Sequence, residues 1–402
     1  MTVAAPRRPT LAERRARGAV AVLFFTNGAL FANLLPRFPR IKADLGLGNT
    51  AYGLAVVAFP VGAIAAGLAA GTAVRLLRSA RVAVLGTLLT GAGILGAGLA
   101  GSVWVLVAML FLAGAADALV DVAQNAHGLR VQRRYGRPII NSLHALWSGG
   151  AVIGGSMAAA AIALELSRGQ HLTISGVVFA LAACLAWRFC LPGPDDESES
   201  DSGTGSDRVE RAERAAPGAR VVFVLTALVV IAMAGILVED AGNSWATLYL
   251  SDSLHAPAAL AAQGYVALVA AQFVGRLVGD RMVGRFGQRT VARSGGLITA
   301  VGMGLALAVP TVPGTVLGFA AAGFGVATLV PTAMHEADEL PGLKPGAGLT
   351  VVSWLMRLGF LLSPPLVGLV ADAAGLRVGL LVVPVAGVLV LLFSGVLSDR
   401  RA

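Results

Sequence analysis

Long apolar runs recur along the chain, and shorter polar segments separate them. Each run is roughly 20 residues long, which is the length of an α-helix that crosses the hydrocarbon core of a bilayer. Gly and Ala stand among the Leu and Val of most runs, and small residues of this kind let membrane helices pack closely. The runs do not alternate over about 10 residues as the strands of a membrane barrel do. We therefore predict an all-α integral membrane protein whose twelve transmembrane helices lie near residues 18–36, 51–74, 82–101, 103–126, 141–164, 171–190, 220–248, 259–278, 295–312, 314–334, 347–371 and 377–397.

Charged residues support this prediction by their number and their placement. Only 13% of the 402 residues are charged, whereas soluble proteins have about a quarter. If the N-terminus is cytoplasmic, 25 of the 31 Lys and Arg lie on the cytoplasmic side, 5 lie on the opposite side and Arg357 lies within a span. This asymmetry follows the positive-inside rule and predicts a multi-pass protein of the cytoplasmic (inner) membrane with both termini in the cytoplasm. It also argues against a nucleic-acid partner, although the net charge is +9.

A polar stretch divides the chain into two halves. Residues 191–219 are dominated by Pro, Gly, Ser and acidic side chains, and a segment of this composition has no apolar face to bury. We interpret it as a disordered cytoplasmic linker. Six predicted helices precede it and six follow it, which predicts two pseudo-symmetric six-helix bundles over residues 1–190 and 220–402.

One glycine-containing segment occurs in both halves. "GLAAGTAVRLLRSAR" begins at residue 67 and "GRLVGDRMVGRFGQR" begins 208 residues later, each at the cytoplasmic end of the second helix of its half. Small residues four positions apart let helices approach closely, and an Asp–Arg pair can bond across a helix end. We interpret the segments as a cytoplasmic gate, and ordinary helix packing is the alternative. The candidate gate residues are Gly67, Gly71, Arg81, Gly275, Gly279, Asp280, Arg281 and Arg289.

The chain resembles the major facilitator superfamily. The resemblance rests on the six-plus-six spans, the polar central linker and a motif similar to "G-x-x-x-D-R-x-G-R-R" after spans 2 and 8, from whose spacing the second copy departs. The stretches "FFTNGALFANLLPRFPRIKADLGLGNTAYGLAVV", "DVAQNAHGLRVQRRYGRPIINSLHALWSGGAVIGG" and "EDAGNSWATLYL" resemble the fucose-permease-like branch and its bacterial inner-membrane members. The resemblance covers nearly the whole chain except the tails and the linker. It implies alternating access around a central cavity lined mainly by spans 1, 4, 7 and 10.

Carboxylates within the predicted span 4 are the first candidates for function, because a charge deep in a bilayer costs about 2.5–3.5 kcal/mol on insertion scales. Asp117 lies about 21 Å from the outer end of this span at 1.5 Å per residue. Asp121 and Asn125 follow at four-residue steps on the same helix face. We predict that Asp117 takes up and releases a proton during transport. Capping of the loop after span 4 is the alternative role for Asp121 and Asn125.

Four further residues are candidates for substrate binding or proton coupling. Arg357 lies about ten residues into span 11, where a guanidinium needs acceptors from a substrate or from a structural ion pair. Asn27 lies near the middle of span 1, where its amide suits a sugar hydroxyl or a contact between helices. His144 and Trp147 open span 5. His144 could titrate near physiological pH or be a structural histidine, and Trp147 could line the cavity or anchor the helix at the membrane interface.

The outer part of span 7 carries the last cluster. The resemblance implies that the segment "VEDAGNSWATLYL" belongs to the cavity and the outer gate. Carboxylates and amides there can bond hydroxyl groups, and a Trp face can stack on a sugar ring. A solvated helix end is the alternative. The residues concerned are Glu239, Asp240, Asn243 and Trp245.

These patterns predict a secondary active transporter. We expect a monomer that moves a small polar solute, such as a sugar or related metabolite, across the cytoplasmic membrane by alternating access coupled to protons. The alternative in the same fold is proton-driven efflux of drugs or amphiphilic metabolites, although span 5 lacks the Gly-Pro pattern usual in such antiporters. A polytopic membrane enzyme is a remote alternative, because no loop gathers catalytic His, Asp and Ser. We expect no cofactor and no metal, since the five His form no metal-ligand spacing.

Overall fold

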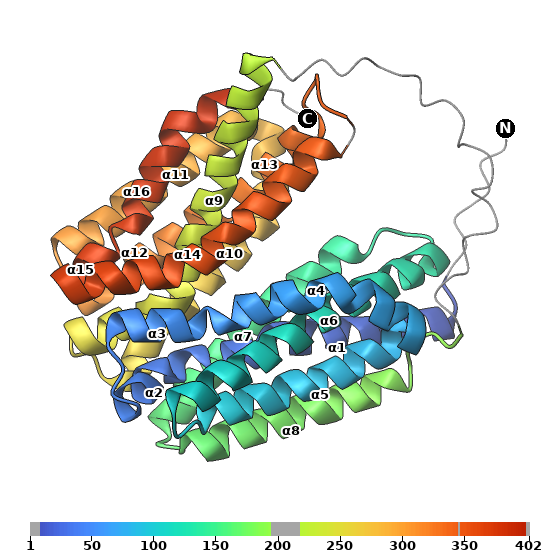
Figure 1. Cartoon of the computed structure of the whole chain (residues 1–402). Helices are drawn as coiled ribbons and strands as arrows, with labels where there is room; N and C mark the ends of the chain where they lie inside the picture. The colour runs from blue at the N-terminus through green and yellow to red at the C-terminus, as the bar shows by residue number, and fades with distance from the viewer. Residues whose placement is uncertain (1–8, 194–217, 345, 399–402) are drawn as a thin grey trace.

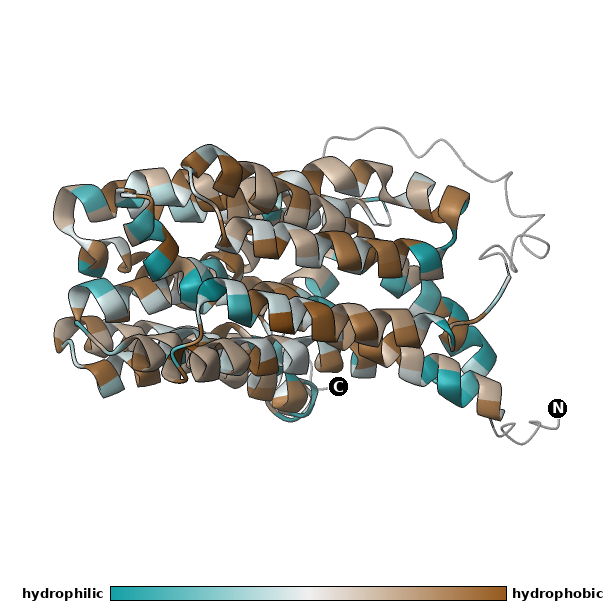
Figure 2. Cartoon of the chain, turned by 90° about the horizontal axis from the view of Figure 1, so that it is seen from below, coloured by the Kyte–Doolittle hydropathy of each residue, from teal (hydrophilic) through white to brown (hydrophobic). Residues whose placement is uncertain are grey.

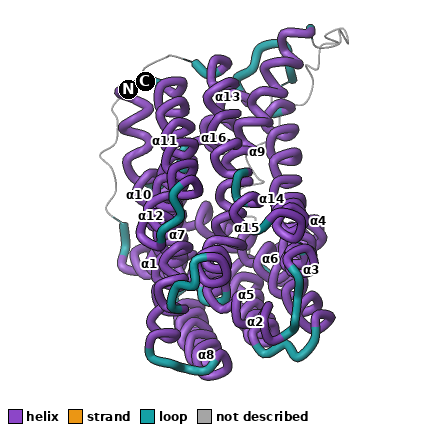
Figure 3. Tube along the Cα trace, turned by 90° about the vertical axis from the view of Figure 1, so that its left-hand side faces the viewer, coloured by secondary structure: helices purple, strands orange, loops and turns teal. Residues whose placement is uncertain are grey.

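The computed structural model of the protein describes residues 9–193, 218–344 and 346–398, and the regular structure within these ranges is entirely helical (Figure 3). Twelve segments of this part are long and apolar enough to cross a membrane. The predicted all-α fold with twelve spans is therefore confirmed. The predicted linker lies largely outside the described residues.

The first half contains six spans, and the first two of them include additional short helices. Helix α1 begins at a capping box, in which the Thr10 side chain accepts from the Glu13 amide at 3.2 Å and the Glu13 carboxylate accepts from the Thr10 amide at 2.7 Å. Helix α6 ends at Gly136, whose φ of 68° is the left-handed conformation that glycine tolerates. The elements are α1 (Leu11–Ala32), η1 (Leu35–Arg37), α2 (Phe38–Asp44), α3 (Asn49–Val56), α4 (Ala58–Leu77), α5 (Ser79–Gly98), α6 (Val103–Tyr135), α7 (Ile140–Ala163) and α8 (Arg168–Trp187).

The second half repeats this arrangement. Two adjacent prolines, Pro364 and Pro365, lie inside its fifth span, which is the eleventh of the described chain. The elements are α9 (Ala219–Leu248), the π-helical turn η2 (Tyr249–Ser253), α10 (Ala258–Phe286), α11 (Gln288–Ala308), α12 (Val312–Val326), α13 (Leu329–Asp338), α14 (Ala347–Ala374), α15 (Leu376–Gly379), α16 (Val382–Phe393) and η3 (Ser394–Val396).

The two halves form two bundles that meet at one end and diverge at the other (Figure 1). They meet where α3 packs against α14 and α2 packs against α9, and α7 packs against α10 closer to the middle. The opposite end holds the start of α1, the end of α8 and the start of α9. We call the first the closed end and the second the open end. Hydrophobic residues cover much of the long sides of the helices, whereas hydrophilic residues gather at the ends and in the middle (Figure 2).

Glycine brings the helices that carry the site into backbone contact. A Cβ added to Gly28 of α1 would lie 2.0 Å from the carbonyl oxygen of Trp147 in α7, and one added to Gly154 would lie 2.3 Å from the carbonyl oxygen of Ala29. No larger residue fits at either position without displacement of a helix. The glycines therefore fix α1 against α7 along the wall of the central cavity, as close packing of membrane helices requires.

Candidate functional site

A cavity of about 280 Å³ lies between the two bundles. Small-molecule sites of proteins usually have volumes of about 300–1,000 Å³, and this cavity lies at the small end of that range, so it suits a small metabolite. Both halves supply its walls, through spans 1, 2, 4 and 5 of the first and spans 7, 8 and 11 of the second. The lining residues with polar or aromatic side chains are Asn27, Phe31, Phe38, Phe59, Asp117, Trp147, Ser148, Glu239, Asp240, Asn243, Ser244, Tyr265, Gln272, Arg276 and Phe360.

The amide of Asn27 connects three helices on the first-half wall. Its Nδ2 donates to Oδ1 of Asp117 at 2.7 Å, and its Oδ1 accepts from Nε1 of Trp147 at 2.8 Å and from Nε2 of Gln124 at 3.3 Å. Asn27 and Gln124 are buried, and Asp117 is half-buried against the cavity. The arrangement holds the Asp117 carboxyl at the cavity surface through one oxygen and leaves the carboxyl able to exchange a proton with the cavity.

Replacement of Asn27 by Ala is expected to lower the stability of the protein. The change removes three hydrogen bonds, each worth about 1 kcal/mol in a typical protein, and leaves the buried amide of Gln124 without its acceptor. We expect a loss of about 2–4 kcal/mol in unfolding free energy, read as a lower midpoint of thermal denaturation in detergent. Asn141→Ala, at an exposed position of α7, is the matched control and is expected to have little effect. Equal midpoints for the two variants would contradict the connecting role of Asn27.

A second polar group lies on the opposite wall and reaches across to the first half. Nε2 of Gln272 donates to Oε2 of Glu239 at 2.6 Å, and Nη2 of Arg276 lies 3.4 Å from the same oxygen. Nη1 of Arg276 donates to Oγ of Ser148 in α7 at 3.3 Å. Arg276 therefore neutralises Glu239 and joins the two bundles at the level of the cavity. Asp240 and Asn243 line the cavity beside this group.

The remaining candidates of span 4 form a cluster outside the lining of the central cavity. Nδ2 of Asn125 donates to Oδ1 of Asp121 at 3.0 Å, and Oδ1 of Asn125 lies 3.1 Å from Nε2 of His144 in α7. Arg357 of α14 is exposed, is close enough to Asp121 to interact with it electrostatically, and lies over the ring of Trp354 at 5.7 Å. The four groups Asp121, Asn125, His144 and Arg357 are called the mouth cluster.

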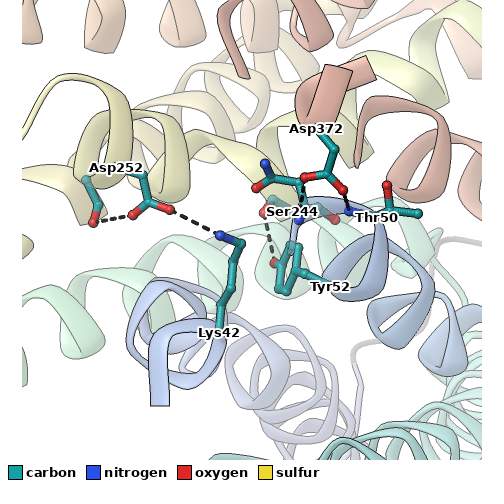
Figure 4. A network of polar contacts seen from close by, with 8 residues as sticks. Lys42, Thr50, Tyr52, Ser244, Asp252 and Asp372 are labelled. Atoms are coloured by element: carbon teal, nitrogen blue, oxygen red, sulfur yellow. Dashed lines mark hydrogen bonds and ion pairs between the residues drawn. The ribbon is translucent and has the colours of Figure 1, made fainter. Parts of the chain in front are cut away.

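The closed end is sealed by contacts between the bundles (Figure 4). The hydroxyl of Tyr52 donates to the carbonyl oxygen of Ser244 at 2.9 Å, and its ring stacks edge-on against Trp245 with centroids 5.1 Å apart. The carboxylate of Asp372 in α14 accepts from the backbone amides of Asn49 at 2.9 Å and Thr50 at 2.8 Å. These amides form the first turn of α3, which has no side-chain cap from its own half, so Asp372 caps it from the other bundle.

An ion pair and two glycines complete this seal. Nζ of Lys42 lies 3.5 Å from Oδ2 of Asp252 (Figure 4). A Cβ on Gly53 would lie 2.3 Å from the carbonyl oxygen of Pro364, and a Cβ on Gly368 would lie 2.5 Å from the carbonyl oxygen of Asn49. The backbones of α3 and α14 thus touch directly at the closed end.

The candidate gate residues lie toward the open end and do not join the bundles in this conformation. Gly67 has open space around it and Gly71 meets only the side chain of Arg75. Asp280 and Arg281 are exposed, and within the described chain neither side chain has a hydrogen bond or ion pair. Gly275 and Gly279 pack instead within their own half, each with an added Cβ at 2.6 Å from α12–α13 junction atoms. The two candidate arginines differ in their surroundings. Arg81 is exposed, whereas Nε of Arg289 donates to the Leu397 carbonyl within its own half at 3.1 Å.

The structure brings together six of the eleven candidates for substrate binding or coupling at the central cavity. Trp245 does not reach it: its side chain is 0% exposed and packs inside the closed end, away from any solute. The resemblance implied a wall from span 10, but α12 and α13 supply no lining residue and pack behind α10 and against α9 and α11. The six that line the cavity are Asn27, Asp117, Trp147, Glu239, Asp240 and Asn243.

Sequence reasoning missed several polar groups of the site, among them Gln124, Gln272 and Arg276. Gln272 and Arg276 lie four residues apart, on one face of α10, and this spacing inside an apolar run was the available signal. Arg276 was instead counted among the cytoplasmic arginines, because it lies only two residues before the expected end of span 8 at residue 278, whereas α10 continues to Phe286. Gln124 is an uncharged residue beside Asp121 and Asn125, and no spacing distinguished it from them.

The sequence pattern of the Major Facilitator Superfamily matches residues 20–334 and 241–402. The uncharacterized transporter y4wD of Sinorhizobium fredii is 28% identical over 380 residues, which cover 94% of this chain and 97% of that protein. Membrane protein MosC of Rhizobium meliloti is 28% identical over 384 residues, which cover 95% of this chain and 90% of that protein.

Solved structures agree with the family match at the level of the fold. The D-xylose-proton symporter has a TM-score of 0.69 at 16% identity, with 96% of this chain and 98% of that chain covered. At so low an identity the likeness concerns the fold alone. The family pattern, which spans both bundles, and the twelve-helix fold together lead to one conclusion: this chain belongs to the major facilitator superfamily, a family of membrane transporters and not of enzymes.

Proposed function

We propose that the protein moves a small polar solute, of the class of a sugar or related metabolite, by proton-coupled alternating access. The single observation that supports this most is a cavity between two bundles that touch at one end only, with carboxyl groups and amides on its walls. The likeness of three stretches to the fucose-permease-like branch supports the same class of solute. The solved structure of a D-xylose-proton symporter with the same fold is consistent with it.

The open end is assigned to the cytoplasm. The described loops and helix ends on this side carry far more Lys and Arg than those at the closed end, as the positive-inside rule requires of a cytoplasmic side. The conformation described is then inward-facing. In the opposite conformation α3 separates from α14, and the Asp280–Arg281 segment approaches the first half as a cytoplasmic gate.

Asp117 is the proposed proton carrier. One of its oxygens is held by Asn27 while the side chain borders the cavity, so a proton can join the carboxyl from whichever side the cavity faces. A neutral carboxyl and an ionised carboxylate interact differently with the two conformations, and only such a difference allows a proton to drive a conformational change. The mouth cluster offers His144 and Asp121 as relay groups between Asp117 and the cytoplasm.

Efflux of amphiphilic molecules is the second candidate function. The observation in its favour is the aromatic character of the walls, to which Phe31, Phe59, Trp147, Tyr265 and Phe360 contribute. Aromatic faces bind both apolar rings and cations. Amides and charged groups at both walls favour the polar solute.

A ligand screen followed by a transport assay tests the proposal. A bound ligand raises the midpoint of thermal unfolding, so purified protein is screened against sugars, sugar acids and cationic drugs. Uptake of the selected solute into proteoliposomes is then measured with and without a protonophore. We expect the protonophore to abolish accumulation. Accumulation that survives collapse of the pH gradient would exclude proton coupling, and stabilisation by cationic drugs alone would favour efflux.

A further inference from the structure

A second cavity of about 430 Å³ lies at the closed end, and it shares no lining residue with the central cavity. Its first-half walls come from η1, α2 and the segment between α7 and α8, and its second-half walls come from the end of α9, η2 and the start of α10. In Figure 1 these segments lie at the end where the bundles meet. A molecule bound in this cavity would touch both bundles.

Positive charge predominates on the walls of this closed-end cavity. Arg40 and Arg168 both pair with Asp44, at 3.0 and 2.7 Å. Arg37 is only 8% exposed, and the partners of its guanidinium are a ring nitrogen of His171 at 3.3 Å and the carbonyl oxygen of Leu166 at 3.1 Å. Within the described chain no carboxylate pairs with Arg37. Its charge is therefore opposed by hydrogen bonds alone, which do not neutralise it.

A neighbouring cation adds to this imbalance. Arg168 is close enough to act electrostatically on Arg37, and two like charges that share one wall repel each other. The second carboxylate of the lining, Glu165, and the guanidinium of Arg40 are both exposed, so water and salt screen both charges. Arg37, Arg168 and Asp44 remain, with one positive charge in excess. An anion in the cavity would relieve the repulsion between the two guanidinium groups.

Hydrogen-bond donors without acceptors line the same cavity. Thr247 is 4% exposed, and its Oγ1 has no partner among the described residues. Nη1 of Arg168 is buried and likewise lacks a partner in the described ranges. A buried donor without an acceptor is costly, and a bound oxyanion would supply acceptors to both groups.

Two helix N-termini contribute further to the positive potential. Arg168 is the first residue of α8, in which the Ser167 side chain already accepts from the Gln170 amide at 3.2 Å, and Ala258 is the first residue of α10. The N-terminus of a helix carries a partial positive charge and free amide groups, which bind anions. The start of α10 has no side-chain cap, so its amides are not occupied by a side chain of the preceding residue.

We propose that the closed-end cavity binds a phosphate or carboxylate group and that its occupancy holds this end shut. Free anions and acidic lipid headgroups share this chemistry. The binding does not depend on the proposed transport. The effect on the closed end rests on the proposed alternating access, because only a cavity with walls from both bundles is lost when they separate.

Thermal unfolding of the full chain in detergent free of acidic lipid tests the binding. Sodium phosphate and sodium citrate are titrated against sodium chloride at equal ionic strength. We expect a saturable rise of the unfolding midpoint with phosphate or citrate beyond that with chloride. In Arg168→Gln the apparent affinity is expected to fall at least about tenfold, as loss of a charge-assisted bond implies. No rise beyond that of chloride, or an equal rise in Arg168→Gln, would overturn the proposal.

Two further variants serve as a control for the loss of charge and as a milder change of the same cavity. Arg377→Gln removes a charge at the same end, where Arg377 donates to the carbonyls of Leu307 and Ala308 and does not line the cavity. It is expected to keep the response to phosphate. Thr247→Val removes a hydroxyl without a partner in the described chain and so preserves folding if Arg168→Gln does not. It is expected to weaken the response, and a response equal to that of wild type would count against the site.

Experiments in lipid nanodiscs distinguish a lipid headgroup from a soluble anion. They also distinguish binding of the anion from its effect on the closed end. If phosphatidylglycerol raises the midpoint of wild type but not of Arg168→Gln, and removes the phosphate response, the occupant is a lipid headgroup. A phosphate response that persists in phosphatidylcholine alone identifies a soluble anion. Spin-label distances across the closed end are then measured with and without the bound anion, and they show whether binding increases the closed population. Binding without any gain in the closed population would overturn the regulatory role and leave the proposed transport untouched.

Discussion

Asp117→Asn is expected to abolish accumulation of the solute against its gradient while solute exchange across the membrane continues. An amide keeps the size of the carboxyl and can still accept from Nδ2 of Asn27, which lies 2.7 Å from Oδ1 of Asp117. It cannot bind and release a proton. For one proton per solute, a pH difference of one unit sustains about tenfold accumulation, since 1.36 kcal/mol corresponds to that ratio. The variant is expected to show a ratio of about one.

Proteoliposomes loaded with the solute selected by ligand screening measure both quantities. Counterflow reports exchange, and uptake under an imposed pH gradient reports accumulation. Asp338→Asn, which removes an exposed carboxylate of α13, is the matched control and is expected to accumulate solute normally. Asp117→Glu, which restores a titratable group, is expected to recover part of the accumulation. Normal accumulation in Asp117→Asn would assign the proton to another carboxyl of the site.

Gly53→Leu is expected to trap the transporter with its closed end open. A Cβ at this position would lie 2.3 Å from the carbonyl oxygen of Pro364, and the rest of a leucine side chain has no space between α3 and α14. Overpacking at a tight contact costs about 1–3 kcal/mol. A change of this size in the equilibrium between two conformations shifts their populations about 5- to 150-fold. Solute flux is expected to fall by a similar factor.

The measurement combines transport with the accessibility of the closed end. In Gly53→Leu the cysteine of an added Ala32→Cys change, at a 2% exposed position that lines the central cavity, is expected to react with an impermeant maleimide from outside, whereas the same cysteine in the Gly53 background stays protected. Gly176→Leu is the matched control, because Gly176 lies in α8 with no atom within 4 Å of an added Cβ. Near-normal flux in Gly53→Leu would show that α3 and α14 need not touch during transport.

The fold could be predicted from the sequence because each transmembrane helix must be long enough to cross the bilayer. Runs of about 20 apolar residues give the number of spans, but they do not give the ends of the helices. Helix α6 continues to Tyr135, where Arg130 holds the carbonyls of Leu191 and Pro192 at 3.3 and 2.6 Å. Such turns beyond the hydrocarbon core are stabilised by protein contacts, and hydropathy does not record these contacts.

The site could be predicted only in part, because its contacts join residues that are far apart in the chain. Asn27 and Asp117 were each singled out as polar groups in an apolar run, yet the bond between them spans 90 residues. Trp245 belongs to the same polar segment as Asp240. Which face of α9 meets Tyr52 of the other bundle depends on how the bundles dock, and periodicity along one helix does not contain that information.

The account depends on a reciprocal motion of the two bundles, and spin-label distances measure it directly. In a background with Cys184 and Cys190 replaced by Ser, one label pair at Leu164→Cys and Val309→Cys reports the closed end. A second pair at Leu76→Cys and Val222→Cys reports the open end; all four positions are exposed. When Gly53→Leu is introduced, we expect the first distance to lengthen and the second to shorten. A longer closed-end distance with an unchanged open-end distance would contradict alternating access around the cavity.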